Sequence, residues 1–341
     1  MKGRTALLSL LAIALFAWFV SRADIADVWV EIQRADVAGL VAGFVCVVAT
    51  YWIRAVRWQH LLRPIGPTRF STAFRATLVG FAALGVLPAR IGDVLRPYLL
   101  ARREGLSVTA TFATIVLERV LDLIAVLALL ALFVWGLSDD ATLPAAIRGP
   151  IEVSSMVAGL GAAGLLAVTW IFASHPERIG GFVETVTRVL PRRLGERLGA
   201  AMRTFSGGFA ATRNPRALAA ATLWSFPLWI AVAAETWFVT RAFGIEMPFS
   251  GSFLLQALLV IGVAVPTPGA VGSYHEAYRI GVTRFFHAPN DAAIAAAIVV
   301  HAIAFVPVVI AGFVVMAQDG LSLAGLRTLA GAAREQGVPP A

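Results

Sequence analysis

Three charged side chains inside an apolar segment are the residues of this sequence that point most directly to chemistry. Glu118, Arg119 and Asp122 lie about ten residues within a continuous apolar stretch that begins at Val108. Helical spacing places Glu118 and Asp122 on one face and allows Arg119 to pair with Asp122. A charge near the middle of a membrane-spanning helix costs about 2.5–3.5 kcal/mol. We therefore expect either the lining of a path for a polar ligand or an ion cluster that fixes a neighbouring segment.

Two other apolar stretches, 77–100 and 249–286, are each interrupted by proline, glycine and charge. In both breaks a β-branched residue and a glycine follow a proline at the third and fourth positions, and a charge follows four residues later. The matching segments are Pro88-Ala-Arg90-Ile-Gly92-Asp93-Val-Leu-Arg96 and Pro268-Gly269-Ala-Val-Gly272-Ser-Tyr-His275-Glu276. Such breaks are typical of broken or re-entrant helices. Arg90 and Arg96 are the cations expected to complete the cluster around Glu118.

The elements that position these residues must be membrane helices, because the composition excludes a soluble protein. Of the 341 residues, 59% are hydrophobic and 14% are charged, whereas a soluble domain has about 45–50% apolar and about 25% charged residues. Six apolar runs come close to or exceed the roughly 20 residues that a span needs, and they cover 5–20, 37–53, 108–135, 153–173, 217–240 and 292–316. We predict an all-α, polytopic membrane bundle with about six full spans and two re-entrant segments.

This division predicts one membrane domain over residues 1–320 and a short tail over 321–341. The run 5–20 is expected to be a retained span, since no small-residue cleavage site follows it. Residues 174–216 place apolar side chains at helical spacing among arginines, and Pro191 is expected to separate two helices. Such a basic amphipathic pair is typical of a segment lying on an anionic membrane surface. Contact with a partner or substrate is the alternative.

The charges of the connecting segments predict the orientation. Residues 54–75 contain five arginines and no acid, and 90–103 and 174–216 are also basic, so these segments are expected in the cytoplasm. The acid-rich segments 22–36 and 136–152 are then outside, and both termini are cytoplasmic in the inner (plasma) membrane. The two broken stretches therefore enter from opposite faces, which is the pattern of an inverted repeat with a binding site near the midplane. A chance likeness between two proline–glycine breaks is the alternative.

Several classes of function are excluded at this stage. The net charge is +8, but the arginines are scattered among spans and short loops without a base-stacking module, which favours anionic lipid over nucleic acid. Cys46 is the only cysteine, so the chain holds no thiolate metal site. No metalloprotease, nucleophile-elbow or Walker motif is present. We predict no catalytic residue, no metal and no cofactor, and leave an oligomer open.

Isolated polar residues on apolar helices are interpreted as interhelical contacts. They are Glu235, Gln256 and His301. Arg54, Arg57 and Trp58 follow the second span, where an arginine–tryptophan pair is first of all an anchor at the membrane interface. Arg57 is also a candidate contact for a lipid headgroup.

Four motifs in order make the sequence resemble the lysylphosphatidylglycerol synthase transmembrane-region family of flippase-like membrane proteins. They are Arg54-x-x-Arg57-Trp58-x-x-Leu61-Leu62, Pro88-x-Arg90-x-Gly92-Asp93-x-x-Arg96, Glu118-Arg119-x-x-Asp122 and Pro266-x-Pro268-Gly269-x-x-Gly272-x-x-x-Glu276. The resemblance extends from about residue 5 to residue 316 and implies an all-helical bundle with re-entrant segments. It also implies movement of a polar-headed phospholipid between leaflets.

The resemblance carries over three groups of residues. Arg90, Asp93 and Arg96 match a basic–acidic motif, Glu118 and Asp122 match the intramembrane acids, and Pro268, Gly269, Gly272 and Glu276 match the second break. The family usually has glutamate at Asp93, and an Asn-rich run where this chain has Ala83-Leu84-Gly85. The second departure removes amides that could contact a headgroup, so the substrate is expected to differ. Some members also carry an aminoacyl-transferase domain, which is not expected here.

The leading hypothesis is a lipid transporter or flippase for an anionic or aminoacylated phospholipid or a lipid-linked intermediate. Arg90, Arg96 and Arg57 would hold the phosphate, and acidic residues would neutralise a cationic headgroup or balance the arginines. The predicted binding set is Arg57, Arg90, Asp93, Arg96, Glu118, Arg119, Asp122, Pro268, Gly269, Gly272 and Glu276. Two alternatives are an enzyme or accessory subunit acting on an isoprenoid phosphate, and a scaffold of an envelope-synthesis complex.

Overall fold

The computed structural model describes residues 2–22, 24–87, 90–137, 145–186, 192–265 and 267–321. Every regular element in these residues is a helix, which confirms the all-α prediction. Pro88, Pro191 and Pro266, together with the tail beyond residue 321, lie outside the described residues.

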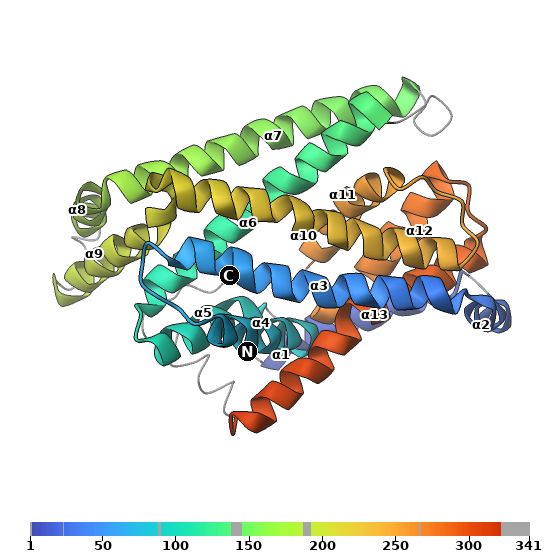
Figure 1. The fold of residues 1–341 in the computed structure, drawn as a ribbon, viewed down its shortest axis with the longest axis horizontal. Helices are drawn as coiled ribbons and strands as arrows, with labels where there is room; N and C mark the ends of the chain where they lie inside the picture. The colour runs from blue at the N-terminus through green and yellow to red at the C-terminus, as the bar shows by residue number, and fades with distance from the viewer. Residues whose placement is uncertain are drawn as a thin grey trace.

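Six long helices correspond to the six predicted spans (Figure 1). They are α1 (Lys2–Val20), α3 (Val37–Leu62), α6 (Val108–Leu132), α7 (Ala145–Ser174), α10 (Pro215–Ala242) and α13 (Asn290–Gln318). Four of them, α3, α7, α10 and α13, are long and apolar enough to cross a membrane. α6 is of similar length, contains the three charged residues and continues into a π-helical turn, η1 (Phe133–Leu137).

The second predicted span ends too early. α3 does not stop at Ile53 but continues for nine residues to Leu62, just before Pro64. No proline or glycine interrupts the helix between Ile53 and Leu62, and Pro64 then lacks the backbone N–H that would continue the helical hydrogen bonds. Arg57 and Trp58 therefore lie within the helix and are fully buried, so their interpretation as interface anchors is wrong.

Both interrupted stretches are helical hairpins. The first consists of α4 (Phe70–Val86) and α5 (Ile91–Glu104), and the second of α11 (Gly251–Ala264), a 3-10 turn η4 (Pro268–Ala270) and α12 (Ser273–Phe285). In hairpin α4–α5 the chain returns so closely that a Cβ atom on Gly92 would overlap the carbonyl oxygen of Gly80. In hairpin α11–α12, Gly262 packs in the same way against the backbone of Ser273.

The two hairpins enter the bundle from opposite ends. In Figure 1, α4 and α5 lie toward the end that carries α8 (Pro176–Val186) and α9 (Arg192–Gly207), whereas α11 and α12 lie toward the end that carries α2 (Ile25–Arg34). α13 connects these ends: Asp319, just after it, binds Arg75 and Arg103 of the first hairpin, and Asn290 at its start binds Arg279 of the second. This arrangement is the one that the opposed-hairpin prediction requires.

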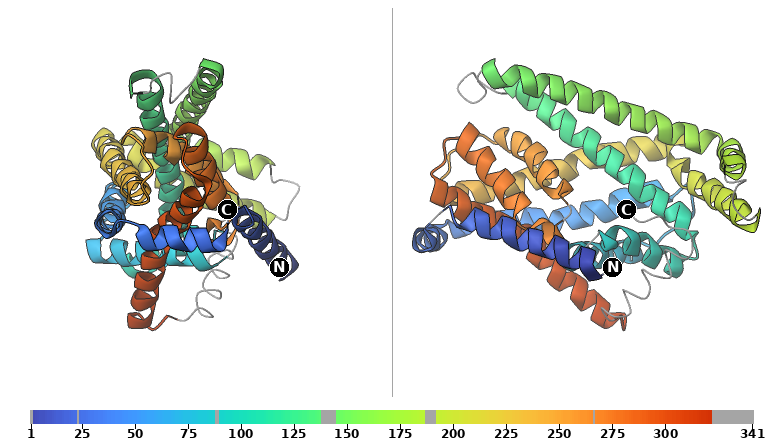
Figure 2. Two further views of the ribbon diagram at one scale, coloured as in Figure 1. Left: turned by 90° about the vertical axis from the view of Figure 1, so that its right-hand side faces the viewer. Right: turned by 180° about the vertical axis from the view of Figure 1, so that it is seen from behind.

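The tips of the two hairpins meet inside the bundle. A Cβ atom on Gly269 of η4 would lie 3.0 Å from the carbonyl oxygen of Gly85 near the end of α4. Gly272 has a φ of 87°, and a Cβ there would overlap Leu15 and Phe16 of α1. Figure 2 shows α1 on the side turned away from the viewer in Figure 1. The second break thus needs glycine both for its backbone conformation and for the packing of α1.

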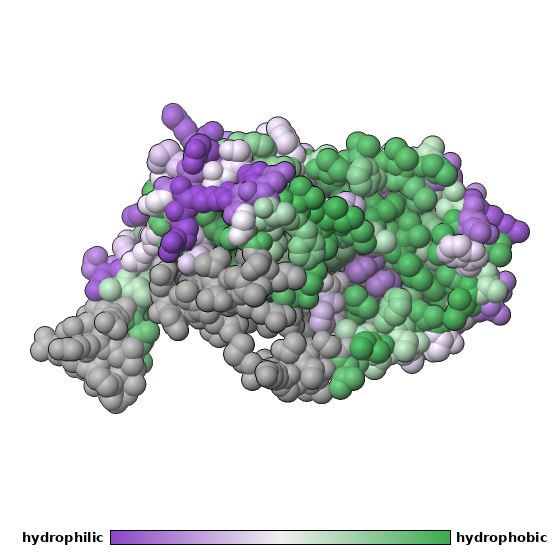
Figure 3. Space-filling view, turned by 90° about the horizontal axis from the view of Figure 1, so that it is seen from below, coloured by the Kyte–Doolittle hydropathy of each residue, from purple (hydrophilic) through white to green (hydrophobic). Residues whose placement is uncertain are grey.

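The surface has the distribution expected of a membrane protein. Figure 3 shows hydrophilic side chains gathered toward the ends of the molecule and hydrophobic side chains between them. The exposed apolar residues include Val41, Trp52, Leu160 and Trp170, which lie along α3 and α7. The basic segment 174–216 forms the two helices α8 and α9, followed by a 3-10 turn, η3 (Gly208–Arg213), as its helical spacing predicts.

Candidate functional site

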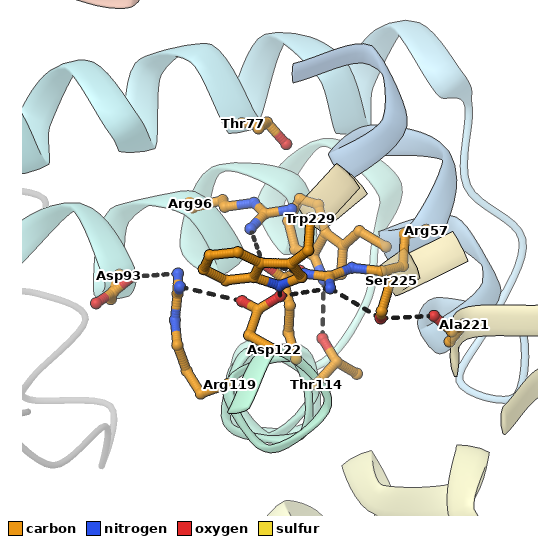
Figure 4. Close-up of polar contacts among 12 residues, drawn as sticks. Arg57, Thr77, Asp93, Arg96, Thr114, Arg119, Asp122, Ala221, Ser225 and Trp229 are labelled. Carbon is orange, nitrogen blue, oxygen red and sulfur yellow. Dashed lines mark hydrogen bonds and ion pairs between the residues drawn. The ribbon is translucent and has the colours of Figure 1, made fainter. Parts of the chain in front are cut away.

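The charged residues of α6 lie at the centre of a buried ion cluster (Figure 4). Glu118 is 0% exposed and Asp122 is 6% exposed, and apolar residues of α6 precede and follow them. α3 contributes Arg57, and hairpin α4–α5 contributes Asp93 and Arg96. Residues far apart in the sequence therefore supply the partners that an isolated charged helix would lack.

The innermost part of the cluster joins α3 and hairpin α4–α5 to α6. Arg57 bridges two carboxylates, with Nη1 2.5 Å from Asp122 Oδ1 and Nη2 3.3 Å from Glu118 Oε1. Arg96 Nη1 lies 2.8 Å from the same Glu118 oxygen. All of these side chains are buried and shielded from water. Arg57 Nη1 donates a charge-assisted hydrogen bond to Asp122 and Arg96 Nη1 donates one to Glu118, whereas Arg57 Nη2 and Glu118 form an ion pair. Glu118 and Arg96 were predicted to meet, and they do.

Two tryptophans fix the geometry of this inner part. The Arg96 guanidinium lies over the Trp58 ring, 4.0 Å from its centroid, and Trp58 Nε1 donates to Thr114 Oγ1 over 2.9 Å. Trp229 Nε1 of α10 donates to Asp122 Oδ1 over 3.0 Å. Stacking on Trp58 keeps the Arg96 guanidinium in a fixed orientation, and the hydrogen bond from Trp229 does the same for the Asp122 carboxylate.

The outer part of the cluster reaches the tip of hairpin α4–α5. Arg119 bridges Asp93 and Asp122 at 3.2 and 3.4 Å, and Arg90 Nε lies 3.0 Å from Asp93 Oδ2. The pairing of Arg119 with Asp122 confirms the expectation from their spacing. Arg90, by contrast, reaches Asp93 and not Glu118. Together the inner and outer parts contain four arginines and three carboxylates, so the cluster has a net positive charge.

A cavity of about 400 Å³ lies beside the outer part, where the two hairpin tips meet. Its lining is mostly apolar and comes from α3, both hairpins, α6, α10 and α13. The charged side chains that line it are Arg54, Arg90, Arg119, Asp122 and Glu235. The inner residues Arg57, Arg96 and Glu118 do not line it. The predicted binding set thus divides into residues that face the cavity and residues that hold the helices around it.

Arg54 was not predicted as a binding residue, yet it faces the cavity. Its guanidinium lies 4.9 Å from the centroid of the Phe81 ring, and its buried Nη1 atom has no hydrogen-bond partner among the described residues. Nor does it form an ion pair within that part of the chain. Arg54 could have been predicted from its position three residues before Arg57, which places both residues on neighbouring turns of one face if the second span is extended to include them.

The residues predicted in the second break have separate roles. Gly269 lines the cavity, and its carbonyl oxygen lies 2.7 Å from His301 Nε2. Pro268 begins the 3-10 turn, and Gly272 is the N-cap that precedes α12, packed against α1. Glu276 is not brought to the cluster, because both of its carboxylate oxygens bind Arg279 on the next turn of α12, at 2.6 and 2.7 Å.

The isolated polar residues differ from one another. Gln256 donates to Thr236 Oγ1 and to the Val232 carbonyl of α10, and His301 binds the second hairpin tip, so both are interhelical contacts as predicted. Glu235 lines the cavity, as Gln256 also does, but it forms no hydrogen bond to another helix among the described residues. Among the residues that the structure describes, no group of three histidine, cysteine or acidic side chains could hold a metal ion.

The fold and the site define a class of protein: a polytopic helical membrane protein with two opposed hairpins that meet at an arginine-rich cavity. The family described as "Lysylphosphatidylglycerol synthase TM region" matches residues 6–312, and the chain therefore belongs to that family. The chain is also similar to "Glycosyltransferase AglD" of Haloferax volcanii, at 25% identity over 341 aligned residues. That alignment covers 93% of this chain and 54% of the relative, so the chain spans about half the relative's length.

Proposed function

We propose that this protein moves a lipid with a phosphate-containing headgroup between the two leaflets of the plasma membrane. The observation that carries the proposal is an excess of arginine at a cavity between two opposed hairpin tips. Binding sites of transporters with inverted repeats lie at such a junction. The membrane setting follows from the family and from the apolar spans.

The chemistry of the cavity suits an anionic headgroup. Arg54, Arg90 and Arg119 face it from three different elements, and Arg54 has no carboxylate partner in the described structure. A guanidinium donates two parallel hydrogen bonds to phosphate oxygens, which a single ammonium cannot do. The apolar remainder of the lining is compatible with the beginning of an acyl or isoprenoid chain.

In this proposal the α8–α9 end lies in the cytoplasm, together with both termini, because the basic segments gather there. Hairpin α4–α5 then controls access from the cytoplasm, and hairpin α11–α12 controls access from outside. The inner residues Arg57, Arg96 and Glu118 hold α3 and α4–α5 on α6, and so position the outer arginines.

The test is leaflet exchange of fluorescent phosphatidylglycerol in liposomes that contain the purified full chain, measured by dithionite quenching. The variants are Arg54→Gln and Arg90→Gln, which remove cavity cations, and the matched control is Arg63→Gln, an exposed arginine just after α3. We expect both cavity variants to slow exchange at least tenfold, since a hydrogen bond to a charged group contributes about 1.5–3 kcal/mol. Absence of exchange by the wild type, or equal rates in all variants, would contradict the proposal.

A second candidate is an enzyme, or an accessory subunit, that acts on a lipid-linked substrate. The observation that favours it is the similarity to a protein named as a glycosyltransferase. The two candidates differ in a measurable way, because an enzyme changes the mass of the lipid headgroup whereas a transporter changes only its leaflet. Mass spectrometry of the lipids after the exchange assay separates them. If Glu118→Gln left both exchange and headgroup chemistry intact, a scaffold would be favoured.

A further inference from the structure

Glu235 is the charged residue of the cavity that has no arginine beside it. It lies in the second half of α10 and is 2% exposed. Its Oε2 atom accepts a hydrogen bond from its neighbour Thr236 over 3.2 Å, and its Oε1 atom has no hydrogen-bond partner among the described residues. Unlike the three carboxylates of the cluster, it forms no ion pair within that part of the chain.

The position of Glu235 separates it from the cluster while keeping it on the same cavity. Trp229, which binds Asp122, is also on α10, and Glu235 follows it by six residues. Six residues of helix correspond to about 9 Å. The cavity thus has an arginine-rich side toward the α8–α9 end and a single carboxyl group toward the α2 end.

Among the described residues, the titratable groups nearest to Glu235 carry no positive charge. α3 faces it with Cys46 and Tyr51, and α12 faces it with Tyr274 and Tyr278. These thiol and phenol groups are ordinarily uncharged at neutral pH. α11 offers the amide of Gln256, which binds Thr236. Further titratable groups on the surrounding helices include Arg54 of α3, which lies over the Phe81 ring on the arginine side of the cavity. Asp122 and Arg119 of α6 belong to the cluster, and His301 of α13 binds Gly269.

An isolated carboxylate in such surroundings is costly, and a proton removes its charge. We infer that Glu235 is a proton-binding site of the cavity and that its protonation is coupled to binding of the anionic headgroup. The inference rests on the proposed function, whose substrate would occupy the arginine side. The proton is taken from water on one side of the membrane and returned to water on the other. A phosphodiester carrying one negative charge and one proton would then cross together as a neutral pair.

The distance gives the expected strength of the coupling. A headgroup phosphate held on the arginine side at the level of Trp229 would lie about 9 Å from Glu235. Two negative charges at that separation, at an effective dielectric constant of about 20, disfavour each other by about twentyfold in binding constant. Ionised Glu235 should therefore weaken binding of the anionic lipid by about that factor. By reciprocity, the bound lipid should favour protonation of Glu235 to the same extent.

The experiment titrates the purified full chain in detergent with short-chain phosphatidylglycerol at a series of pH values, followed by tryptophan fluorescence. The wild type should lose affinity by about twentyfold as the pH rises through the titration of Glu235. Glu235→Gln should keep the high affinity at every pH, because the amide mimics the protonated acid. Glu246→Gln, which changes an exposed carboxyl beyond the end of α10, is the matched control and should behave like the wild type.

Two results would overturn the inference but leave the proposed function standing. One is a wild-type affinity for phosphatidylglycerol that does not change with pH, and the other is an affinity of Glu235→Gln that changes with pH as much as that of the wild type. A wild type that binds no phosphatidylglycerol at any pH would overturn the coupling together with the proposed substrate class. Infrared difference spectroscopy then tests the proton site by itself. The carbonyl band of a protonated carboxylic acid should be present in the wild type and lost in Glu235→Gln, and its persistence in the variant would refute the assignment.

Discussion

Arg54 and Arg57 provide the sharpest test of how the site is organised, because they lie one turn apart on α3 and face different surroundings. Arg57 is fully buried and bridges Asp122 and Glu118. Arg54 faces the cavity and pairs with no described carboxylate. The same substitution at the two positions should therefore have different consequences: Arg57→Gln should reduce stability, and Arg54→Gln should reduce binding of the anionic lipid.

The magnitudes follow from what each side chain leaves behind. Arg57→Gln removes the cation that joins Asp122 to Glu118 and leaves Arg96 and Arg119 to compensate both acids. Removing one partner of a buried pair typically costs about 3–5 kcal/mol. Arg54→Gln breaks no ion pair, so we expect the free energy of unfolding to change by less than about 1 kcal/mol. Loss of hydrogen bonds from Arg54 to a phosphate should instead cost about 1.5–3 kcal/mol of binding, which is about ten- to a hundredfold in affinity.

Both quantities can be measured on the same preparations. Unfolding by denaturing detergent, followed by the fluorescence of the nine tryptophans, gives the free energy of unfolding. The dependence of the exchange rate on the mole fraction of fluorescent phosphatidylglycerol gives the apparent affinity. The division into a structural and a binding arginine would be refuted if Arg54→Gln destabilised the protein as much as Arg57→Gln. It would equally be refuted if Arg57→Gln left the stability unchanged within about 1 kcal/mol.

Three further predictions concern the hairpins. Gly92→Val should force α4 and α5 apart and cost at least about 1–3 kcal/mol through overpacking. Gel filtration should then show a loss of monodisperse protein, whereas the control Gly136→Ala should stay monodisperse, because its added Cβ atom makes only an ordinary contact. Asp319→Asn breaks two partly exposed ion pairs and should lower the unfolding free energy by no more than about 1 kcal/mol; a larger loss would show that this contact holds the first hairpin in place. Glu276→Gln should leave lipid exchange unchanged, because Glu276 binds Arg279 away from the cavity; a rate as low as that of Arg54→Gln would show that it belongs to the site.

The parts of the fold and site that could be predicted from the sequence share one physical origin. A charge in an apolar helix and a proline–glycine break in an apolar stretch both cost free energy that neighbouring residues must offset. Glu118 and Asp122 therefore marked the cluster, and Arg96 was the natural partner. The same reasoning located both hairpins, since their interruptions exclude uninterrupted spans.

The remainder depended on contacts between distant segments. The prediction ended the second span at Ile53 and so placed Arg54 and Arg57 outside it, because local hydropathy falls at these arginines. Hydropathy contains no information on the partners that bury Arg57, which are on α6 and α10. Glu276 matched the motif, but spacing alone could not tell whether it would pair with Arg279, three residues later on α12, or with the arginines of the cluster. Glu235 resembled any single polar residue on an apolar helix. Both Glu235 and Gln256 line the cavity, and what separates them is that Gln256 bonds across helices to α10, whereas Glu235 bonds only to its neighbour Thr236 among the described residues.

The cluster also explains why its cations are arginines. Arg57 uses its two terminal nitrogens on two different carboxylates, and Arg119 does the same between Asp93 and Asp122. A lysine ammonium concentrates its charge at one point and lacks the planar fork that can span two acids held apart by separate helical turns. With bridging arginines, three carboxylates are compensated in a continuous chain, and the inner pairs hold hairpin α4–α5 firmly on α6. Arg54 has no carboxylate partner among the described residues, and in the proposed function it is the cation available to the anionic headgroup.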